Sequence, residues 1–148
     1  MKKILLFICL ALTINSFGQW SSIANGNWNN PATWNTGTVP PNFGAYTVDI
    51  NHDVILNVNK NGAAWTLTVN IGATLTQSGC RRIESYNAGS HFINHGTITC
   101  EYIDSPGNVT NTGTVHLSRL SLYTAGELHN SISGDFNTSK LAIFDAGI

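Results

Sequence analysis

Residues Trp65 to Thr76, WTLTVNIGATLT, decide the fold because they hold a strand pattern and a turn signature together. Apolar residues alternate with threonine and asparagine from Trp65 to Ile71, which is the period-two pattern of a strand with one buried face. The strand ends in Asn70-Ile71-Gly72, a polar residue, an apolar residue and a glycine that suits a tight turn. The stretch therefore predicts a strand that runs into a corner.

This corner triplet returns along the chain. Its glycine, Gly72, is followed at spacings of 17, 18, 19 and 21 by equivalent glycines, which are Gly89, Gly107, Gly126 and Gly147. A second series, with spacings of 17, 17 and 21, runs through Gly79, Gly96, Gly113 and Gly134. Two series with a similar period indicate two corners per coil. We therefore predict an all-β fold, a parallel β-helix or β-solenoid of about 17–21 residues per coil.

An apolar residue recurs in each coil at a fixed offset from a corner, as a continuous stacked core requires. The two predicted stacks are Ile98, Val115 and Phe136, and Phe92, Val109 and Leu128. Arg81 interrupts the first stack, since it falls where Ile98 and Val115 lie and an unpaired buried guanidinium is costly. We expect the register to slip at residues 80–82, or a bulge to turn Arg81 outward.

Upstream of Trp65 the pattern predicts two more strands. Tyr46 to Ile50 alternate, residues 51–53 read as a turn, and Val54 to Val58 alternate again. Asn59-Lys60-Asn61-Gly62 reads as a second turn. We expect three strands separated by tight turns to form about one coil.

Residues 1–19, MKKILLFICLALTINSFGQ, are typical of a secretory signal peptide. Lys2 and Lys3 precede an apolar run from Ile4 to Leu12, and small residues follow at Ser16 to Gly18. A membrane helix needs about 20 apolar residues, roughly twice this run, and the mature sequence has no second apolar run that could span a bilayer. We expect cleavage near Gln19 and a protein that is secreted or held at the cell surface.

The mature chain carries few charges. Without Lys2 and Lys3 it has five basic residues against eight acidic ones, a net charge of −3. Nucleic acid is therefore not an expected partner. Asparagine, threonine, serine and glycine are abundant, which suits a secreted β-protein with hydroxyl and amide side chains on its surface.

Residues 20–45 read as a Trp-, Asn- and Pro-rich N-terminal loop without strand or helix periodicity. Trp28 and Trp34 lie in it, six residues apart. One interpretation is that their rings cap the end of the β-stack, as a terminal repeat requires. The other is that they form a platform on which sugar rings stack. The solenoid itself is predicted from residue 46 to residue 148.

The segment from Asn27 to Gly79 resembles the eight-glycine ("G-eight") domain and related modules of bacterial secreted surface proteins. The resemblance is carried by the order of four stretches, NWNNPATW, NTGTVPP, YTVDINHDVILNV and WTLTVNIGATLT. Those proteins open with a tryptophan-rich segment and pass a Gly-x-x-Pro corner, here Gly37 to Pro40. The resemblance implies that the chain continues as a right-handed parallel β-helix. The early strands here have fewer glycines than that pattern, and the corner has two prolines, Pro40 and Pro41.

Cys80 and Cys100 are the only cysteines of the mature chain. An exported pair is a disulfide candidate. Against a disulfide, Cys100 falls at an inward position of the repeat, where a free thiol acts as a small apolar residue.

The candidate chemistry is weak. The histidines have different offsets from the corner glycines, so we predict no metal site or cofactor; they are His52, His91, His95, His116 and His129. Asp49 and Asp53 flank a turn in which such side chains usually bond local backbone, with a calcium site as the alternative. Glycoside hydrolysis needs two carboxyl groups about 5–9.5 Å apart, and the acidic residues are scattered by offset.

The sequence favours a secreted, non-enzymatic β-solenoid module of a bacterial cell-surface or adhesin-like protein, serving as a scaffold or spacer. One alternative is a carbohydrate-binding module that uses Trp28, Trp34 and outward aromatics such as Tyr102 or Tyr123. The other is the non-catalytic portion of a larger polysaccharide-degrading enzyme. The expected partners are an extracellular glycan or further coils.

The fifth corner triplet, Asp145-Ala146-Gly147, is followed only by Ile148. Residues 141–148 contain nothing that resembles a polar terminal cap. We therefore expect either that the natural protein continues with more coils, or that a partner or self-association covers this end.

Overall fold

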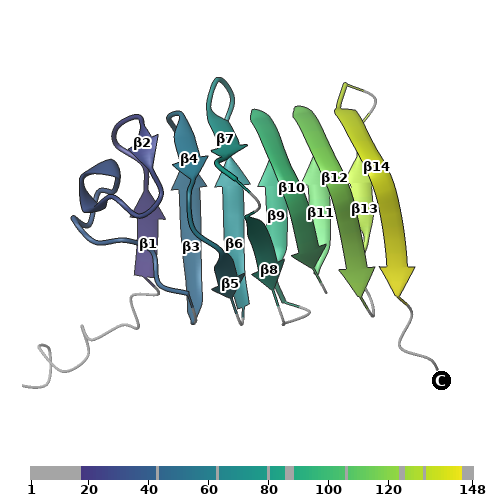
Figure 1. Ribbon diagram of the computed structural model, residues 1–148, viewed down its shortest axis with the longest axis horizontal. Helices are drawn as coiled ribbons and strands as arrows, with labels where there is room; N and C mark the ends of the chain where they lie inside the picture. The colour runs from purple at the N-terminus through teal and green to yellow at the C-terminus, as the bar shows by residue number, and fades with distance from the viewer. Residues whose placement is uncertain are drawn as a thin grey trace, which may run out of the picture.

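The computed structural model describes residues 18–42, 44–62, 64–79, 81–85, 89–105, 107–123, 126–131 and 133–144. These residues form fourteen β-strands and one short 3-10 helix, η1 (Pro31–Thr33). The pairs between these strands are parallel, and the strands stack along the long axis from β1 (Gly18–Ser21) to β14 (Asp135–Phe144) (Figure 1). The predicted all-β parallel solenoid is confirmed.

One face of the solenoid is a six-stranded sheet with the order β1, β3, β6, β9, β11, β13. Its strands after β1 are β3 (Ala45–Ile50), β6 (Ala64–Val69), β9 (His91–Asn94), β11 (Asn108–Asn111) and β13 (Leu128–Asn130). The sheet grows by one strand with each coil, because every coil returns to the same face before it turns the corner.

The return path of each coil forms the second sheet, in the order β2, β4, β7, β10, β12, β14. Its remaining strands are β2 (Gly26–Asn27), β4 (Val54–Leu56), β7 (Thr74–Gln77), β10 (Thr97–Ser105) and β12 (Thr114–Tyr123). The short strands β5 (Lys60–Gly62) and β8 (Arg82–Ser85) extend it, since β5 pairs with β8 and β8 pairs with the second half of β10.

The long strands of the return path cover two faces. In β10 the buried residues Ile98 and Cys100 alternate regularly, but the next buried apolar residue is Ile103, so Glu101 and Tyr102 both point outward. The strand β12 repeats this shift at its residues 118 and 119. Two consecutive outward residues move the inward positions from one face of the solenoid to the next.

The core is built from rows of side chains in register. Val48 pairs with Leu67, and the row continues through Phe92, Val109 and Leu128, as predicted for the last three. The predicted row of Ile98, Val115 and Phe136 is also confirmed, and it begins upstream with Val54 and Leu75. Most of these side chains are at most 5% exposed, with Leu128 and Phe136 partly buried near the end of the stack.

The assignment of corners by glycine series needs one correction. Asn70-Ile71-Gly72 forms the corner from β6 to β7, with Gly72 at φ +81° and Ala73 N donating to Asn70 O. Gly96 lies at this same corner one coil later, because Thr97 N donates to Ala73 O. Gly72 therefore belongs to the series of Gly96, whereas Gly89 lies at the opposite corner, before β9.

Arg81, which the glycine spacing aligned with the buried Ile98, is not the equivalent of Ile98 in the structure. Leu75, and not Arg81, is the partner of Ile98, while Arg82 pairs with Tyr102 four positions further along β10. The segment between β7 and β8 thus contains additional residues that the continuous strand β10 lacks. The register slips in this segment, which is the first of the two outcomes expected for residues 80–82.

The expected turn at residues 59–62 is wrong. Lys60–Gly62 is strand β5, and Lys60 pairs with the core residue Ile83. Its side chain is only 3% exposed. Asparagine and glycine around the lysine suggested a turn, but the backbone here is extended and the lysine points inward.

Coil lengths exceed the predicted range in the N-terminal half. Leu67 pairs with Phe92, and Trp20 pairs with Val48, and both separations along the chain are longer than the longest glycine spacing. The additional residues lie in loops between strands, and the pairing register of the strands is kept. The coil from Phe92 to Val109 has the predicted length, equal to the shortest glycine spacing.

Asparagines replace apolar residues in one inward row at the corner that follows the first sheet. Asn94 pairs with Val69, and Asn94 Nδ2 donates to Asn111 Oδ1 at 2.7 Å. Asn111 Nδ2 donates in turn to Asn130 Oδ1 at 2.7 Å. Asn94 and Asn111 are 2% and 0% exposed. Side chains that bond their equivalents in the next coil supply acceptors for the buried Nδ2 groups of Asn94 and Asn111 and fix the register.

The N-terminal loop is part of the stack. Strand β1 pairs with β3 and strand β2 pairs with β4, so residues 18–27 already form a partial first coil before the predicted start at residue 46. Of the predicted signal peptide, residues 1–17 lie outside the described residues, while Gly18 and Gln19 belong to β1, and the signal peptide stays a prediction. In the described part of the chain no helix has the length and apolar character that spanning a bilayer requires.

Candidate functional site

Trp28 and Trp34 are 0% and 1% exposed. Their rings meet edge to face with centroids 5.0 Å apart, and Trp34 Nε1 donates to Trp28 O at 2.8 Å. Trp28 also meets the ring of Trp65 edge to face at 6.3 Å. A sugar stacks only on an exposed ring face. These two tryptophans are therefore buried residues that cover the end of the core, and they do not form a sugar platform.

Cys100 points inward and is 6% exposed, and its thiol is free in the structure. Burial in apolar surroundings raises the pKa of this thiol to about 12. A thiol with such a pKa is a poor nucleophile at neutral pH. Cys80 lies outside the described residues, so a bond between the two cysteines stays a prediction.

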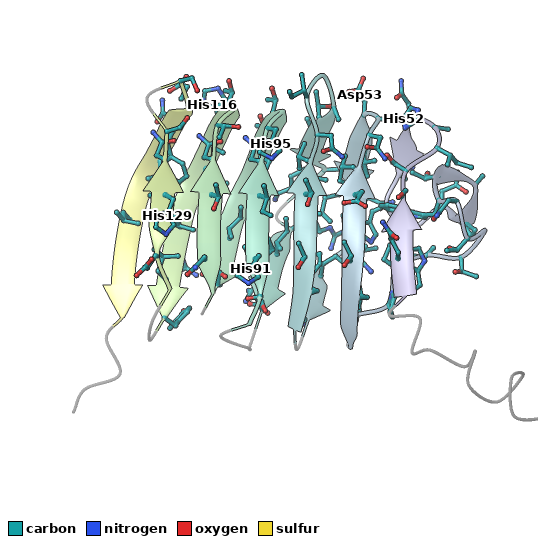
Figure 2. All side chains as sticks on the ribbon, turned by 180° about the vertical axis from the view of Figure 1, so that it is seen from behind. His52, Asp53, His91, His95, His116 and His129 are labelled. Atoms are coloured by element: carbon teal, nitrogen blue, oxygen red, sulfur yellow. The ribbon has the colours of Figure 1, made fainter. Side chains whose placement is uncertain are left out.

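The histidines lie apart from one another (Figure 2). His95 Nδ1 is 2.6 Å from Thr112 Oγ1 at one corner, and His129 Nε2 is 2.9 Å from Glu127 Oε2 on the first sheet. Across the described residues no three His, Cys, Asp or Glu side chains gather as ligands of a metal ion would.

Asp49 and Asp53 both bond across coils. Asp49 Oδ2 accepts from Gln19 Nε2 at 3.0 Å, and Asp53 Oδ1 accepts from Thr74 Oγ1 at 2.9 Å. The predicted local Asx bonds are replaced by contacts with the preceding and following coils. Both carboxylates help to hold neighbouring coils together.

Two carboxylates that the sequence seemed to scatter are neighbours. Glu84 of β8 and Asp104 of β10 are register partners, which places their Cα atoms about one inter-strand spacing apart. Each is bonded to its own arginine: Arg82 Nη1 lies 2.6 Å from Glu84 Oε1, and Arg119 Nη2 lies 3.2 Å from both oxygens of Asp104. The guanidinium of Arg119 also lies 4.9 Å from the ring centroid of Tyr102. These groups already have partners: the Arg82–Glu84 pair lies within β8, and the Arg119–Asp104 pair joins neighbouring coils.

Lys60 is the buried cation of the N-terminal end. Its Nζ donates to Pro40 O at 2.7 Å and to Asn42 Oδ1 at 3.1 Å, and it lies 5.4 Å from the ring centroid of Trp28. Its described partners are neutral acceptors. Desolvation by burial therefore lowers the pKa of Lys60 to about 8. The ammonium ties the N-terminal loop to the first complete coil.

A shallow open groove of about 460 Å³ crosses the strands on the return face. It extends over four coils, because its lining residues come from β7, β10, β12 and β14: Gln77, Thr99, Cys100, Glu101, His116, Leu117, Ser118 and Asn137. Cys100 and Leu117 are core residues that form part of the groove's floor, and the exposed side chains of the groove are polar. The groove is parallel to the solenoid axis.

The polar side chains of the groove form two rows. Thr99, His116 and Asn137 are register partners in consecutive coils, and Glu101 and Ser118 follow two residues later in their strands. Gln77 is fixed at one end, where its amide contacts the backbone N–H and the carboxylate of Glu101.

Most of these groups are free to bind a ligand. Within the described part of the chain, the side chains of Thr99, His116, Ser118 and Asn137 make no hydrogen bond to protein, and all four are exposed. They offer hydroxyl, imidazole and amide groups beside the carboxylate of Glu101. Within the described residues, the groove is therefore a candidate binding site.

Sequence reasoning missed the groove and the buried lysine. A signal for the groove was present in the repeat alignment, since Thr99 and His116 both stand three residues after a corner glycine, Gly96 and Gly113. No comparable signal marks Lys60, whose neighbours are typical of a turn.

Comparisons with protein-family models, with curated proteins and with solved structures found no match to this chain.

Proposed function

We propose that this protein is a secreted, non-enzymatic β-solenoid module of a bacterial cell-surface or adhesin-like protein, and that it serves as a rigid scaffold or spacer. The observation that carries the proposal is the continuous inward row from Val48 to Leu128, closed at its N-terminal end by buried tryptophans. A rod built this way has its length set by the number of coils, since each coil adds about 4.8 Å.

The outer surface supports the same role. Outward positions of the strands carry threonine, serine, asparagine and a few ion pairs, as the faces of a scaffold in contact with water require. The predicted leader peptide supports export. The carboxylates of Glu84 and Asp104, which belong to register partners, are both bonded to arginines and so are not free to act as the acid and base that glycosidase chemistry needs.

Export is tested by producing the full chain with a C-terminal epitope in a bacterial host and labelling intact cells. The matched control lacks residues 1–19. We expect the full chain outside the cytoplasm and the shortened chain inside it. Cytoplasmic retention of both would contradict the proposal. Release of new reducing ends or unsaturated sugars from a polysaccharide panel would contradict the non-enzymatic part.

A second candidate function is carbohydrate binding. It no longer depends on Trp28 and Trp34, which are buried. What favours it is the open polar groove over β7, β10, β12 and β14. The scaffold function and this binding function are compatible, because the groove lies on an outer face that the core does not use.

A further inference from the structure

We propose that the groove binds a linear, neutral polysaccharide that lies along the solenoid axis. This inference rests on the second candidate function and adds the site, the orientation and the ligand class. The groove spans three inter-strand spacings from β7 to β14, roughly 14 Å at about 4.8 Å each. A ligand that uses it fully must be extended and must present similar groups at intervals, as a polymer of sugars does.

The chemistry of the lining favours hydroxyl groups. A sugar hydroxyl is both a donor and an acceptor, and it needs partners of both kinds close together. The groove supplies the carboxylate of Glu101 as an acceptor, the amide group of Asn137 as a donor and acceptor, the hydroxyls of Thr99 and Ser118, and the ring nitrogens of His116, whereas the Gln77 amide is already bonded to Glu101 and Gly79. Planar polar groups that are not committed to other protein groups can form such bonds with little rearrangement.

Other ligand classes fit less well. The described residues that line the groove include no lysine or arginine, and a nucleic acid or another polyanion would meet the carboxylate of Glu101 without a compensating cation. An extended peptide binds by adding a strand to a sheet edge, whereas the groove crosses the face of a sheet whose strands are already paired on both sides at β10 and β12. A lipid would need a larger apolar surface, because Cys100 and Leu117, the apolar residues of the lining, are only 6% and 5% exposed.

The bound polymer would make equivalent contacts in successive coils. Thr99, His116 and Asn137 occupy one row, so a sugar chain parallel to the axis passes each of them in turn. Each contact is weak by itself, but several along one chain act together. We therefore expect longer oligosaccharides to bind more tightly than short ones.

The test uses the purified protein in affinity electrophoresis through gels that contain a neutral polysaccharide, with a panel of β-glucan, xylan, galactomannan and the acidic polymer alginate. The variant His116→Ala/Asn137→Ala removes two described groups that make no hydrogen bond to protein, so the fold should be unaffected. The matched control is His91→Ala, an exposed histidine on the first sheet. Circular dichroism and melting temperature confirm that all the variants are folded.

We expect at least one neutral polymer to retard the wild-type protein and the His91→Ala control equally. The double variant should bind about five- to tenfold more weakly, the loss expected for one or two hydrogen bonds. The proposal is overturned if no neutral polymer retards the wild-type protein, if alginate alone does, or if the double variant binds as well as the control. None of these outcomes affects the export test, so failure of the groove and failure of the scaffold function are separable.

Discussion

Replacing Lys60 by methionine should make the stability difference from wild type depend on pH. Lys60 is 3% exposed and burial lowers its pKa from 10.5 to about 8. Between these two values the unfolded chain holds a proton that the folded chain has released. The free energy of unfolding of the wild-type protein therefore rises with pH across this window. Methionine has a similar length and no titrating group, so the variant lacks this contribution.

The magnitude follows from the shift. About 2.5 pKa units, at 1.36 kcal/mol each, correspond to about 3 kcal/mol. At pH 7 the wild-type protein bears the full cost of burying an ammonium, which the bonds to Pro40 O and Asn42 Oδ1 partly offset. The variant loses both the cost and the bonds, so its stability relative to wild type at pH 7 alone decides little. The change of that difference with pH is the informative quantity.

The assay is urea unfolding at several pH values from 7 to 10.5, followed by the fluorescence of the buried tryptophans. The stability of wild type minus that of Lys60→Met should rise by about 3 kcal/mol over this range. Burial raises the pKa of Cys100 and of Tyr46, which weakens the folded state at high pH, but both groups are present in both proteins and cancel in the difference.

The control is Lys140→Met, because Lys140 is exposed on β14. Its difference from wild type should be flat across the same pH range. A flat curve for Lys60→Met as well, or a difference that falls with rising pH, would show that the buried ammonium does not carry the cost assigned to it.

Three further experiments test the stacking. Val115→Asp should unfold the protein or lower its stability by several kcal/mol, because Val115 is 2% exposed. Thr114→Asp should change the stability by only about 0.5 kcal/mol, because Thr114 points outward. Equal melting temperatures for the two variants would mean that the register is wrong. Asn111→Leu should cost about 2 kcal/mol or more in urea unfolding, since it removes the buried side chain that bonds Asn94, Asn130 and the Gly113 backbone N–H. Asn70→Leu breaks one exposed bond and should cost less than half as much, and the reverse order would refute the ladder. Gly113→Ala should cost about 1–3 kcal/mol, because its Cβ would collide with the backbone of the preceding coil, and an unchanged melting temperature would contradict that packing.

The regular part of the fold could be predicted from the sequence. From Phe92 onward each coil has one strand on the first sheet and one long strand on the return path, so a fixed period in the sequence corresponds to a fixed position in the coil. That is why the rows through Ile98 and through Val109 were assigned correctly. Alternation of apolar and polar residues, together with glycine spacing, contains this information locally.

The irregular part could not be predicted because its register depends on pairing across coils. Gly72 and Gly89 have the same spacing as true equivalents, yet they lie at opposite corners. The difference arises from additional loop residues between β7 and β9, which change the coil length without changing any local pattern. The repeat alignment contains the row of Thr99 and His116, but the contact of Gln77 with Glu101, which closes one end of the groove, depends on the register across this interruption.

Lys60 can point inward because its strand, β5, is the edge strand of its part of the second sheet. In the next three coils the equivalent inward positions are Ile83, Ile103 and Leu120, each covered by a neighbour on both sides. Among the described strands β5 pairs with β8 alone, so its other side faces the N-terminal loop instead of another strand. The loop presents the carbonyl of Pro40 to the interior, and a buried carbonyl without a donor would cost about 1–3 kcal/mol. A lysine is long enough to reach that carbonyl from the core and can donate to a second acceptor as well. The first complete coil therefore has a lysine where later coils have an apolar residue, because its neighbour on that side is loop backbone. The pH dependence that separates wild type from Lys60→Met measures the free-energy cost of burying this lysine's charge.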